Sequence, residues 1–229
     1  MNNIDFSKIL FLDIETVPQE KDWNGLDERT QKLWDKKTEN QRKEDFSAEE
    51  FYHQRAGILA EFGKIVCISC GIIHQDKIRL KSFTNKSEHL LLTEFVKLLE
   101  ENFNQPTNLL CAHNGKEFDF PFLGRRLLIN QIKIPKILQL QGKKPWEINH
   151  LDTLELWKFG DYKHYTSLDL LANVFGIETP KDDIDGSQVA KVYYEDQDIE
   201  RIQKYCEKDV VTLINIFLKM NYSNPISVE

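Results

Sequence analysis

The sequence feature that most constrains the fold is one apolar strand near the N-terminus. Residues 8–17 read as a β-strand whose two faces are both apolar, apart from the acidic side chains of Asp13 and Glu15. A strand that is apolar on both faces is typical of the centre of a sheet covered by helices on each side. The sequence therefore predicts a layered α/β domain built around this strand.

The remaining hydrophobic patterns predict four further strands and a series of helices. β-branched and alternating runs predict strands, whereas apolar residues three and four apart predict helices. The strands are expected at 64–74, 77–84, 108–113 and 148–154, and the helices at 87–102, 120–130, 167–175 and 198–220. Three strands precede the first of these helices, which favours a mixed five-stranded sheet flanked by helices over a doubly wound sheet. This order is typical of the ribonuclease-H-like fold.

Residues 19–60 interrupt the pattern directly after the central strand. The segment is rich in Lys, Glu, Asp and Gln but also contains Trp23, Trp34 and Phe51. Large aromatic side chains can form a small core, so we predict a helical insertion packed close to Glu15, with disorder as the alternative. At 229 residues one core suffices, so residues 1–229 are predicted to form a single domain.

Charge and hydropathy exclude two classes of protein. The net charge of −7 and the pI near 5.5 argue against a protein that coats long nucleic acid, although not against an enzyme that binds one strand end. No stretch reaches the roughly 18 apolar residues of a membrane span. The first residues carry no basic segment followed by an apolar run. We therefore expect a cytoplasmic protein that does not enter the membrane.

The four cysteines are expected to be reduced and buried. Cys67 and Cys70 form a CxxC motif inside the predicted strand 64–74. Residues three apart on a strand face opposite sides, and no second ligand pair accompanies them. This spacing argues against a zinc site, and a chain of this size has no need of a disulfide framework.

Three acidic residues lie on predicted strands. Asp13 and Glu15 are two residues apart, so their carboxylates project from the same face. Two carboxylates on an otherwise buried strand are costly unless a cation meets them. These two residues alone are equally compatible with a metal site and with a strand end that reaches solvent. Asp152, on the strand predicted at 148–154, is expected to have a supporting structural role.

Two further acids each have an alternative explanation. Asp119 follows a strand and precedes a helix with proline in its first turn, which is typical of a helix N-cap. Asp209 lies beside the apolar stripe of the C-terminal helix, with Tyr205 on the same face four residues earlier. A salt bridge to Arg125 or Arg126 is the alternative to a metal-ligand role for Asp209.

Taken together, three motifs resemble those of a known superfamily, the DEDD (DnaQ-like) 3′–5′ exonucleases, in its tyrosine-bearing DEDDy branch. The motifs are Phe11-Leu-Asp-Ile-Glu-Thr, His113-Asn-Gly-Lys-Glu-Phe-Asp and Tyr205-Cys-Glu-Lys-Asp209. Their order and wide spacing match over almost the whole chain. Within that branch, residues 61–69 and 184–189 resemble the predicted exonucleases related to the proofreading domain of family-B DNA polymerases.

The resemblance implies a site for two Mg²⁺ or Mn²⁺ ions. Asp13, Glu15 and Asp209 are implied to be direct ligands, with Asp13 bridging to a second ion whose surroundings Asp119 completes. Ligands that are all carboxylates suit these hard ions rather than zinc. Tyr205 is implied to orient the attacking water, because a tyrosine with an unperturbed pKa of about 10 is a poor base at neutral pH.

The expected substrate contacts are side chains next to these motifs. Aromatic and apolar side chains stack on any base, and cationic or polar side chains contact phosphates and sugars. The candidates are Leu12, Thr16, Asn114, Lys116, Phe118 and Phe122. Core packing is the alternative for the apolar candidates, and a solvated surface position is the alternative for the lysine.

The predicted function is metal-dependent hydrolysis of single-stranded DNA from its 3′ end to 5′-mononucleotides. An RNA exonuclease of the ribonuclease D type is one alternative, because the contacts that read the sugar lie outside the metal cluster. A non-catalytic nucleic-acid-binding module on the same fold is the other. The expected partner is the 3′ end of a single strand, with DNA favoured over RNA. A role in proofreading or DNA repair requires a polymerase or repair protein in trans.

Overall fold

The computed structural model describes residues 5–42, 45–161, 165–179 and 184–229. Its five-stranded sheet has the order β3-β2-β1-β4-β5. The strands are β1 (Ile9–Pro18), β2 (Gly63–His74), β3 (Lys77–Thr84), β4 (Leu109–Ala112) and β5 (Leu151–Asp152). β1 pairs antiparallel with β2 and parallel with β4, which confirms the predicted central strand and the mixed sheet.

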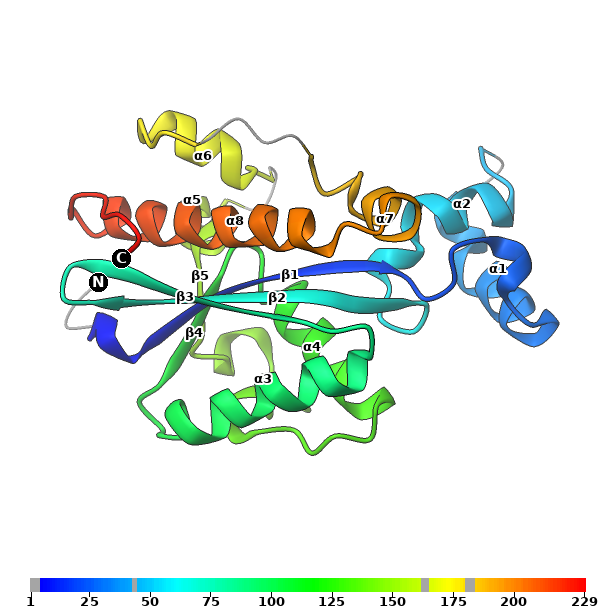
Figure 1. Ribbon diagram of the computed structural model, residues 1–229, viewed down its shortest axis with the longest axis horizontal. Helices are drawn as coiled ribbons and strands as arrows, with labels where there is room; N and C mark the ends of the chain where they lie inside the picture. The colour runs from blue at the N-terminus through cyan, green and yellow to red at the C-terminus, as the bar shows by residue number, and fades with distance from the viewer. Residues whose placement is uncertain (1–4, 43–44, 162–164, 180–183) are drawn as a thin grey trace.

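Helices cover both faces of this sheet (Figure 1). The α-helices of the described residues are α1 (Glu28–Arg42), α2 (Ala48–Arg55), α3 (Glu88–Asn102), α4 (Asp119–Ile129), α5 (Thr153–Lys158), α6 (Leu168–Val174), α7 (Val189–Lys191) and α8 (Ile199–Met220). α3 and α4 lie on one face, and α8 lies on the other with α5 and α6 beside it (Figure 1). No helix in the described ranges combines the length and hydropathy needed to cross a bilayer.

The alternation of side chains along β1 directs the acidic pair toward α8. Leu10, Leu12 and Ile14 pack in the core formed with α3 and α4, whereas Ile9 and Phe11 pack in the core formed with α8. Because successive side chains of a strand point to opposite faces, the two acids at positions 13 and 15 share the face of Phe11. The carboxylates are therefore directed into the layer between the sheet and α8.

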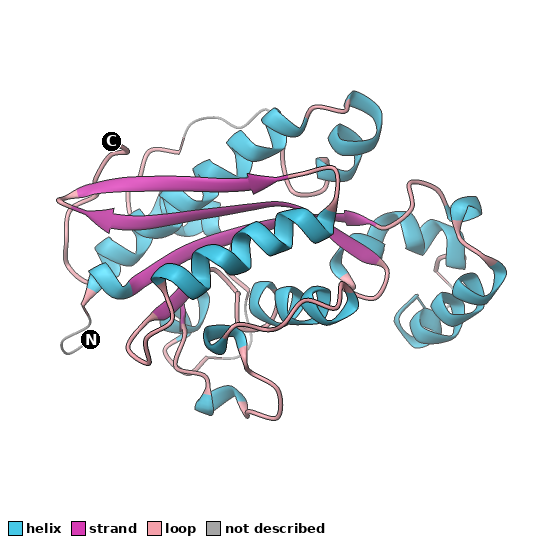
Figure 2. Ribbon diagram, turned by 60° about the horizontal axis from the view of Figure 1, so that its bottom comes forward, coloured by secondary structure: helices cyan, strands magenta, loops and turns pink. Residues whose placement is uncertain are grey.

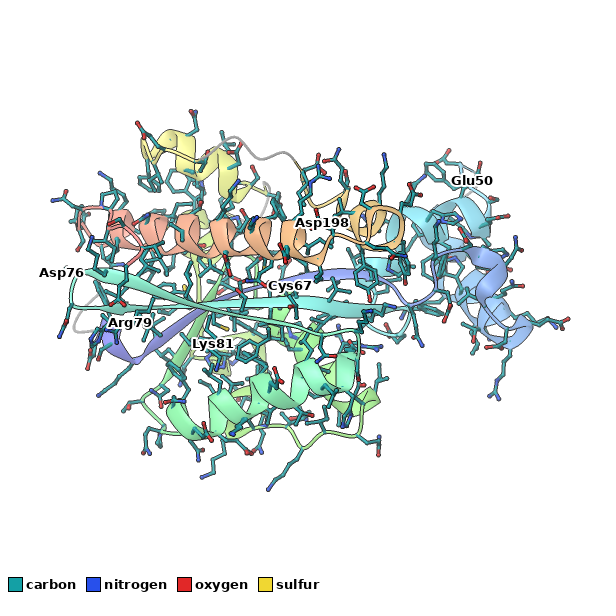
Figure 3. The ribbon with its side chains drawn as sticks, viewed as in Figure 1. Glu50, Cys67, Asp76, Arg79, Lys81 and Asp198 are labelled. Carbon is teal, nitrogen blue, oxygen red and sulfur yellow. The ribbon has the colours of Figure 1, made fainter. Side chains whose placement is uncertain are left out.

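A β-bulge interrupts the pairing of β1 with β2 beside the acidic pair. Glu15 lies opposite Cys67 but Thr16 lies opposite Ile65, so Val66 is the extra residue on β2. Val66 and Cys67 consequently both pack on the α8 side, where Figure 3 shows Cys67 below that helix. Bulges change the direction of side chains and are frequent next to active sites.

The close approach of α8 to the sheet depends on a glycine in β2. A Cβ atom at Gly71 would lie 2.7 Å from Ile214 Cδ1 and 2.9 Å from Val210 Cγ1. These separations are too short for a side chain, so the absence of one lets α8 settle onto β1 and β2. The helix thereby carries the residues of its first half over the acidic pair.

We call residues 19–60 the arm, and its described residues form the helices α1 and α2. α1 and α2 project beyond the end of β1 in both views (Figures 1 and 2). They enclose a small aromatic core in which Trp34 and Tyr52 are fully buried. Trp34 Nε1 donates a hydrogen bond to Ala48 O at 2.8 Å, and Tyr52 Oη donates to Glu20 O at 3.1 Å. The arm thus has its own small core, and Tyr52 connects it to the segment that directly follows β1.

One predicted strand is shorter than expected. Residues 148–154 were predicted as a strand, but β5 covers only Leu151–Asp152 and α5 begins at Thr153. The Asp152 carboxylate accepts hydrogen bonds from Leu154 N and Glu155 N. This N-cap starts a helix at the point where the hydrophobic pattern alone favours a longer strand.

The four cysteines are free and buried. Cys67 packs on the α8 side of the sheet, whereas Cys70 packs on the α3 and α4 side. The prediction that the CxxC residues face opposite sides is confirmed, and this arrangement separates the two thiols too widely for a shared metal.

Candidate active site

The five residues predicted to be catalytic meet at one cleft. The cleft has a volume of about 1220 Å³ and is bordered by β1, the loop after β4, the segment before α7 and the middle of α8. Its lining includes all five predicted residues: Asp13, Glu15, Asp119, Tyr205 and Asp209. Three segments that are far apart in the sequence therefore contribute side chains to the same surface.

Asp13, Glu15 and Cys206 form the inner part of this site. One potential ligand atom of each lies within 4.8 Å of those of the other two. Cys206 Sγ is 3.4 Å from both Asp13 O and Asp13 Oδ2, so the thiol donates toward the carboxylate rather than standing apart in the core. From the sequence, this cysteine was expected only to be a buried thiol. Its position between Tyr205 and Asp209 on α8 was the available signal.

The acidic pair is held in an unfavourable electrostatic environment. Burial raises the pKa of Asp13 well above its usual range, and the charges of Asp119 and Asp209 raise it further. Burial also raises the pKa of Glu15, followed by the charges of Asp13 and Asp209. A positive charge in the cleft would relieve both effects, because it favours the ionised carboxylates.

Asp119 is the first residue of α4 rather than its N-cap, which excludes the alternative explanation of this residue. Phe118 occupies the N-cap position, and no side-chain capping bond is present there. Burial raises the pKa of Asp119 to about 7, and the charge of Asp152 also raises it. Hydrogen bonds from the backbone N–H groups of Asp119 and Ile14 lower this pKa in part. Its Oδ1 atom is buried and has no hydrogen-bond partner among the described residues. A buried carboxylate oxygen without a partner is the feature expected of an atom that accepts a cation.

Asp152 holds the loop that leads to Asp119. In addition to capping α5, its carboxylate accepts hydrogen bonds from Asn114 N at 2.9 Å and Lys116 N at 3.0 Å. Asn114 adopts φ = 62°, a left-handed conformation that asparagine tolerates better than most residues. A Cβ atom at Gly115 would lie 2.4 Å from that of Ala112, so the turn admits no side chain there. The structural role predicted for Asp152 is confirmed.

Tyr205 and Asp209 lie one turn apart on α8 and interact with each other. Burial raises the pKa of Tyr205 strongly, and the charges of Asp209, Glu15 and Asp13 raise it further, as does its hydrogen bond to Asp209. The phenol is therefore neutral at physiological pH. Of the two arginines considered as partners for Asp209, Arg126 instead donates from Nε to Glu88 Oε1 at 2.8 Å.

Only some of the residues predicted to contact the substrate line the cleft. Asn114 and Phe118 line the cleft. Leu12 and Phe122 do not, because both are buried in the core on the α3 and α4 side, so these two predictions are corrected. Leu12 follows the strand alternation away from its acidic neighbour, and Phe122 lies on the inner face of α4.

Thr16 and Lys116 also lie outside the described lining of the cleft. Lys116 Nζ pairs with Glu155 Oε2 at 2.8 Å, and its side chain is largely buried. Thr16 directly follows Glu15 in β1, so strand alternation directs its side chain to the opposite face. Sequence proximity to an acidic motif was therefore a poor guide to the cleft surface.

The donor atoms of the site suit hard divalent cations. Carboxylate oxygens are the preferred ligands of Mg²⁺ and Mn²⁺. The carboxyl groups that line this cleft include those of all four predicted ligands. The unpartnered oxygen of Asp119 and the raised pKa values of the acidic pair both indicate a site that is incomplete without positive charge. The residues present therefore fit a divalent-metal centre.

Comparison with solved structures agrees with this fold. The chain is similar to a family B DNA polymerase from the hyperthermophilic archaeon Pyrobaculum calidifontis, with a TM-score of 0.59 and 15% identity over 92% of this chain and 24% of the polymerase. At this identity the likeness shows the shared ribonuclease-H-like fold, and the chain spans about a quarter of the polymerase. E. coli Exonuclease I in complex with a dT13 oligonucleotide is more distant, with a TM-score of 0.44 and 12% identity over 93% of this chain and 42% of that protein.

A family model matches residues 58–225, which is well over half of the chain. The matched range contains Asp119, Tyr205 and Asp209 and begins after β1, so the acidic pair on that strand is joined to the site by the geometry of the fold. The description of the family is a predicted 3′–5′ exonuclease related to the exonuclease domain of PolB. The chain therefore belongs to the family of predicted 3′–5′ exonucleases related to the PolB exonuclease domain.

Proposed function

We propose that this protein is a 3′–5′ exonuclease of the DEDDy branch that hydrolyses single-stranded DNA to 5′-mononucleotides. The observation that carries the proposal is the convergence of four carboxyl groups and Tyr205 on one cleft, where a buried Asp119 oxygen has no hydrogen-bond partner among the described residues. DNA is favoured over RNA because the family is related to the exonuclease domain of a DNA polymerase. Any proofreading or repair role would be exerted in trans, on the product of another protein.

The acidic residues would hold two divalent ions. We assign Asp13, Glu15 and Asp209 as ligands and place Asp119 beside the second ion. When bound, such ions stabilise the negative charge that develops on phosphate and lower the pKa of water. Cys206 donates to Asp13 and so restricts the orientation of that carboxylate. The protein contributes a fixed arrangement of charges that needs no rearrangement during the reaction.

Tyr205 is assigned to position the attacking water. Its raised pKa keeps the hydroxyl protonated, and this hydroxyl donates to the Asp209 carboxylate. The lone pairs of the phenol oxygen remain able to accept a hydrogen bond from water. Half-buried Phe118 and exposed Tyr165, both in the cleft lining, offer aromatic surfaces for the terminal base.

The proposed activity is tested with 5′-labelled single-stranded DNA and RNA oligonucleotides of the same sequence. With Mg²⁺ or Mn²⁺ we expect products that shorten progressively from the 3′ end, faster on DNA, and no products with a chelator or with Asp209→Ala. Faster shortening of RNA would support the ribonuclease D alternative. Metal-independent binding without any product would support the non-catalytic module.

Replacement of Tyr205 by phenylalanine separates positioning from base catalysis. We expect kcat to fall by about 10²-fold, the scale typical of losing one positioned hydrogen-bonding group in catalysis. The pH–rate profile should keep the same alkaline limb as the wild-type enzyme, because the phenol does not titrate in that range. Tyr193→Phe, which alters a tyrosine outside the cleft, is the matched control. A change in the shape of the profile in Tyr205→Phe would show that the phenol transfers a proton.

A further inference from the structure

The arm contributes directly to the catalytic cleft. Arg55, the last residue of α2, and Ile58, in the 3₁₀ turn that follows (Ala56–Ile58), line the same cleft as the catalytic residues. Glu50, in the first turn of α2, lies at the outer side of the arm, so the helix runs from there back toward the sheet (Figures 1 and 3). The direction of α2 therefore brings its C-terminal residue to the cleft.

The backbone of Arg55 is held in place by buried neighbours, whereas its side chain is exposed to solvent. Tyr52, three residues earlier, and Ala56, the next residue, are both fully buried in the aromatic core of the arm. The Arg55 side chain itself is exposed and makes no hydrogen bond or ion pair with any other described residue. An arginine held by its neighbours but without a partner is available for a ligand.

The charge of the cleft indicates what that ligand is. Six carboxyl groups line it, and metal ions at the catalytic centre would neutralise only the inner ones. Among the described residues of the lining, the cationic side chains are Arg55 and Lys208. Lys208 adjoins Asp209 in α8, so Arg55 is the cation on the side of the arm. A polyanion that leaves the catalytic centre toward the arm meets this guanidinium, whose planar donors fit phosphate oxygens.

We propose that Arg55 binds a backbone phosphate of a nucleotide upstream of the scissile bond. The arm thereby makes the enzyme selective for polynucleotide chains over esters of a single nucleotide. This inference rests on the proposed exonuclease function and adds to it a specificity-determining residue. It also explains why an insertion placed immediately after the catalytic strand ends in an exposed cation at the cleft.

The test compares two substrates that differ in their upstream phosphates. One is a short single-stranded oligothymidylate, and the other is the p-nitrophenyl ester of thymidine 5′-monophosphate, which has no upstream phosphate. Arg55→Ala is expected to lower kcat/KM on the oligonucleotide about tenfold more than on the ester, the scale of one lost hydrogen-bonded charge contact. Arg55→Lys should recover part of this loss. Arg29→Ala removes an exposed arginine of α1 outside the cleft and should match the wild type on both substrates.

Equilibrium binding tests the contact independently of catalysis. Fluorescence anisotropy of the labelled oligonucleotide in Ca²⁺ should show about tenfold weaker binding for Arg55→Ala and a slope against log salt smaller by about 0.7, as expected for one fewer phosphate contact. Equal losses on the two substrates, or unchanged binding, would overturn the assignment. If the wild type cleaves neither substrate, the proposed function fails, and the anisotropy result alone decides whether Arg55 binds the strand.

Discussion

Replacement of Asp13 by asparagine is expected to lower the rate of oligonucleotide cleavage by about 10³-fold or more in a protein that remains folded. The carboxylate lies within reach of Glu15 and Cys206 and is electrostatically coupled to Asp119 and Asp209. An amide of the same shape removes the charge that would bind a cation. Metal ions contribute several kcal/mol of transition-state stabilisation, and about 4 kcal/mol corresponds to about 10³-fold in rate.

The same substitution should not harm the stability of the metal-free protein. The amide removes a carboxylate that burial and its neighbours disfavour, so the melting temperature above neutral pH should be equal to or higher than that of the wild type. Asp76→Asn is the matched control, because Figure 3 shows Asp76 at the tip of the β2–β3 hairpin, far from Cys67. Its left-handed conformation, φ = 59°, accepts asparagine. Cleavage by Asp13→Asn within about tenfold of the wild type, a loss of only about 1.4 kcal/mol, would contradict the assignment.

Divalent metal ions are expected to stabilise the protein, and the effect should grow with pH. The pKa of Asp119 is raised from 3.8 to about 7 in the folded protein, so the folded state holds its proton more tightly than the unfolded state. Stability from this group is present in full below pH 3.8 and is lost as the pH rises through about 7. The loss is on the order of 4 kcal/mol, and Asp13 and Glu15 contribute with the same sign.

Thermal unfolding with and without Mg²⁺ measures this linkage. At a concentration 100 times its Kd the ion stabilises the folded state by about 2.7 kcal/mol, which raises the melting temperature by roughly 5–10 °C in a chain of this size. The shift should be large at pH 8 and small at pH 5, where protons compete with the ion. Asp119→Asn should raise the metal-free melting temperature at pH 8 and reduce the shift. A shift that is the same at both pH values would refute the linkage.

Much of the fold was predictable because its signals are local. The apolar faces of β1 identified the sheet centre, and helical spacing predicted α3, α4 and α8 to within a few residues. The strand predicted at 148–154 was too long, because the Asp152 side chain accepts hydrogen bonds from backbone N–H groups and starts a helix. The sequence neighbours of Asp119 also suit an N-cap, but this alternative is excluded because the helix begins one residue earlier than such a cap allows.

The site residues, like the fold, were predictable where the signal is local. The acidic pair was predictable from strand alternation, and Tyr205 and Asp209 from helical spacing. Leu12 and Phe122 were assigned to the substrate by their proximity to the motifs, but burial in the core excludes them from the cleft. The contacts of Cys206 and Arg55 depend on how α8 and α2 dock, which no local pattern specifies.

The sequence by itself determined which side chains are candidates for the chemistry and on which face of each element they lie, because alternation in strands and spacing in helices are properties of neighbouring residues. Only the tertiary structure decided that these faces meet. The closeness of α8 to β2 depends on Gly71, 139 residues before Val210 in the chain. The access of Arg55 to the cleft depends on the packing of the aromatic core of the arm. Both are contacts between distant segments, whose energy comes from burial and fit rather than from any local preference.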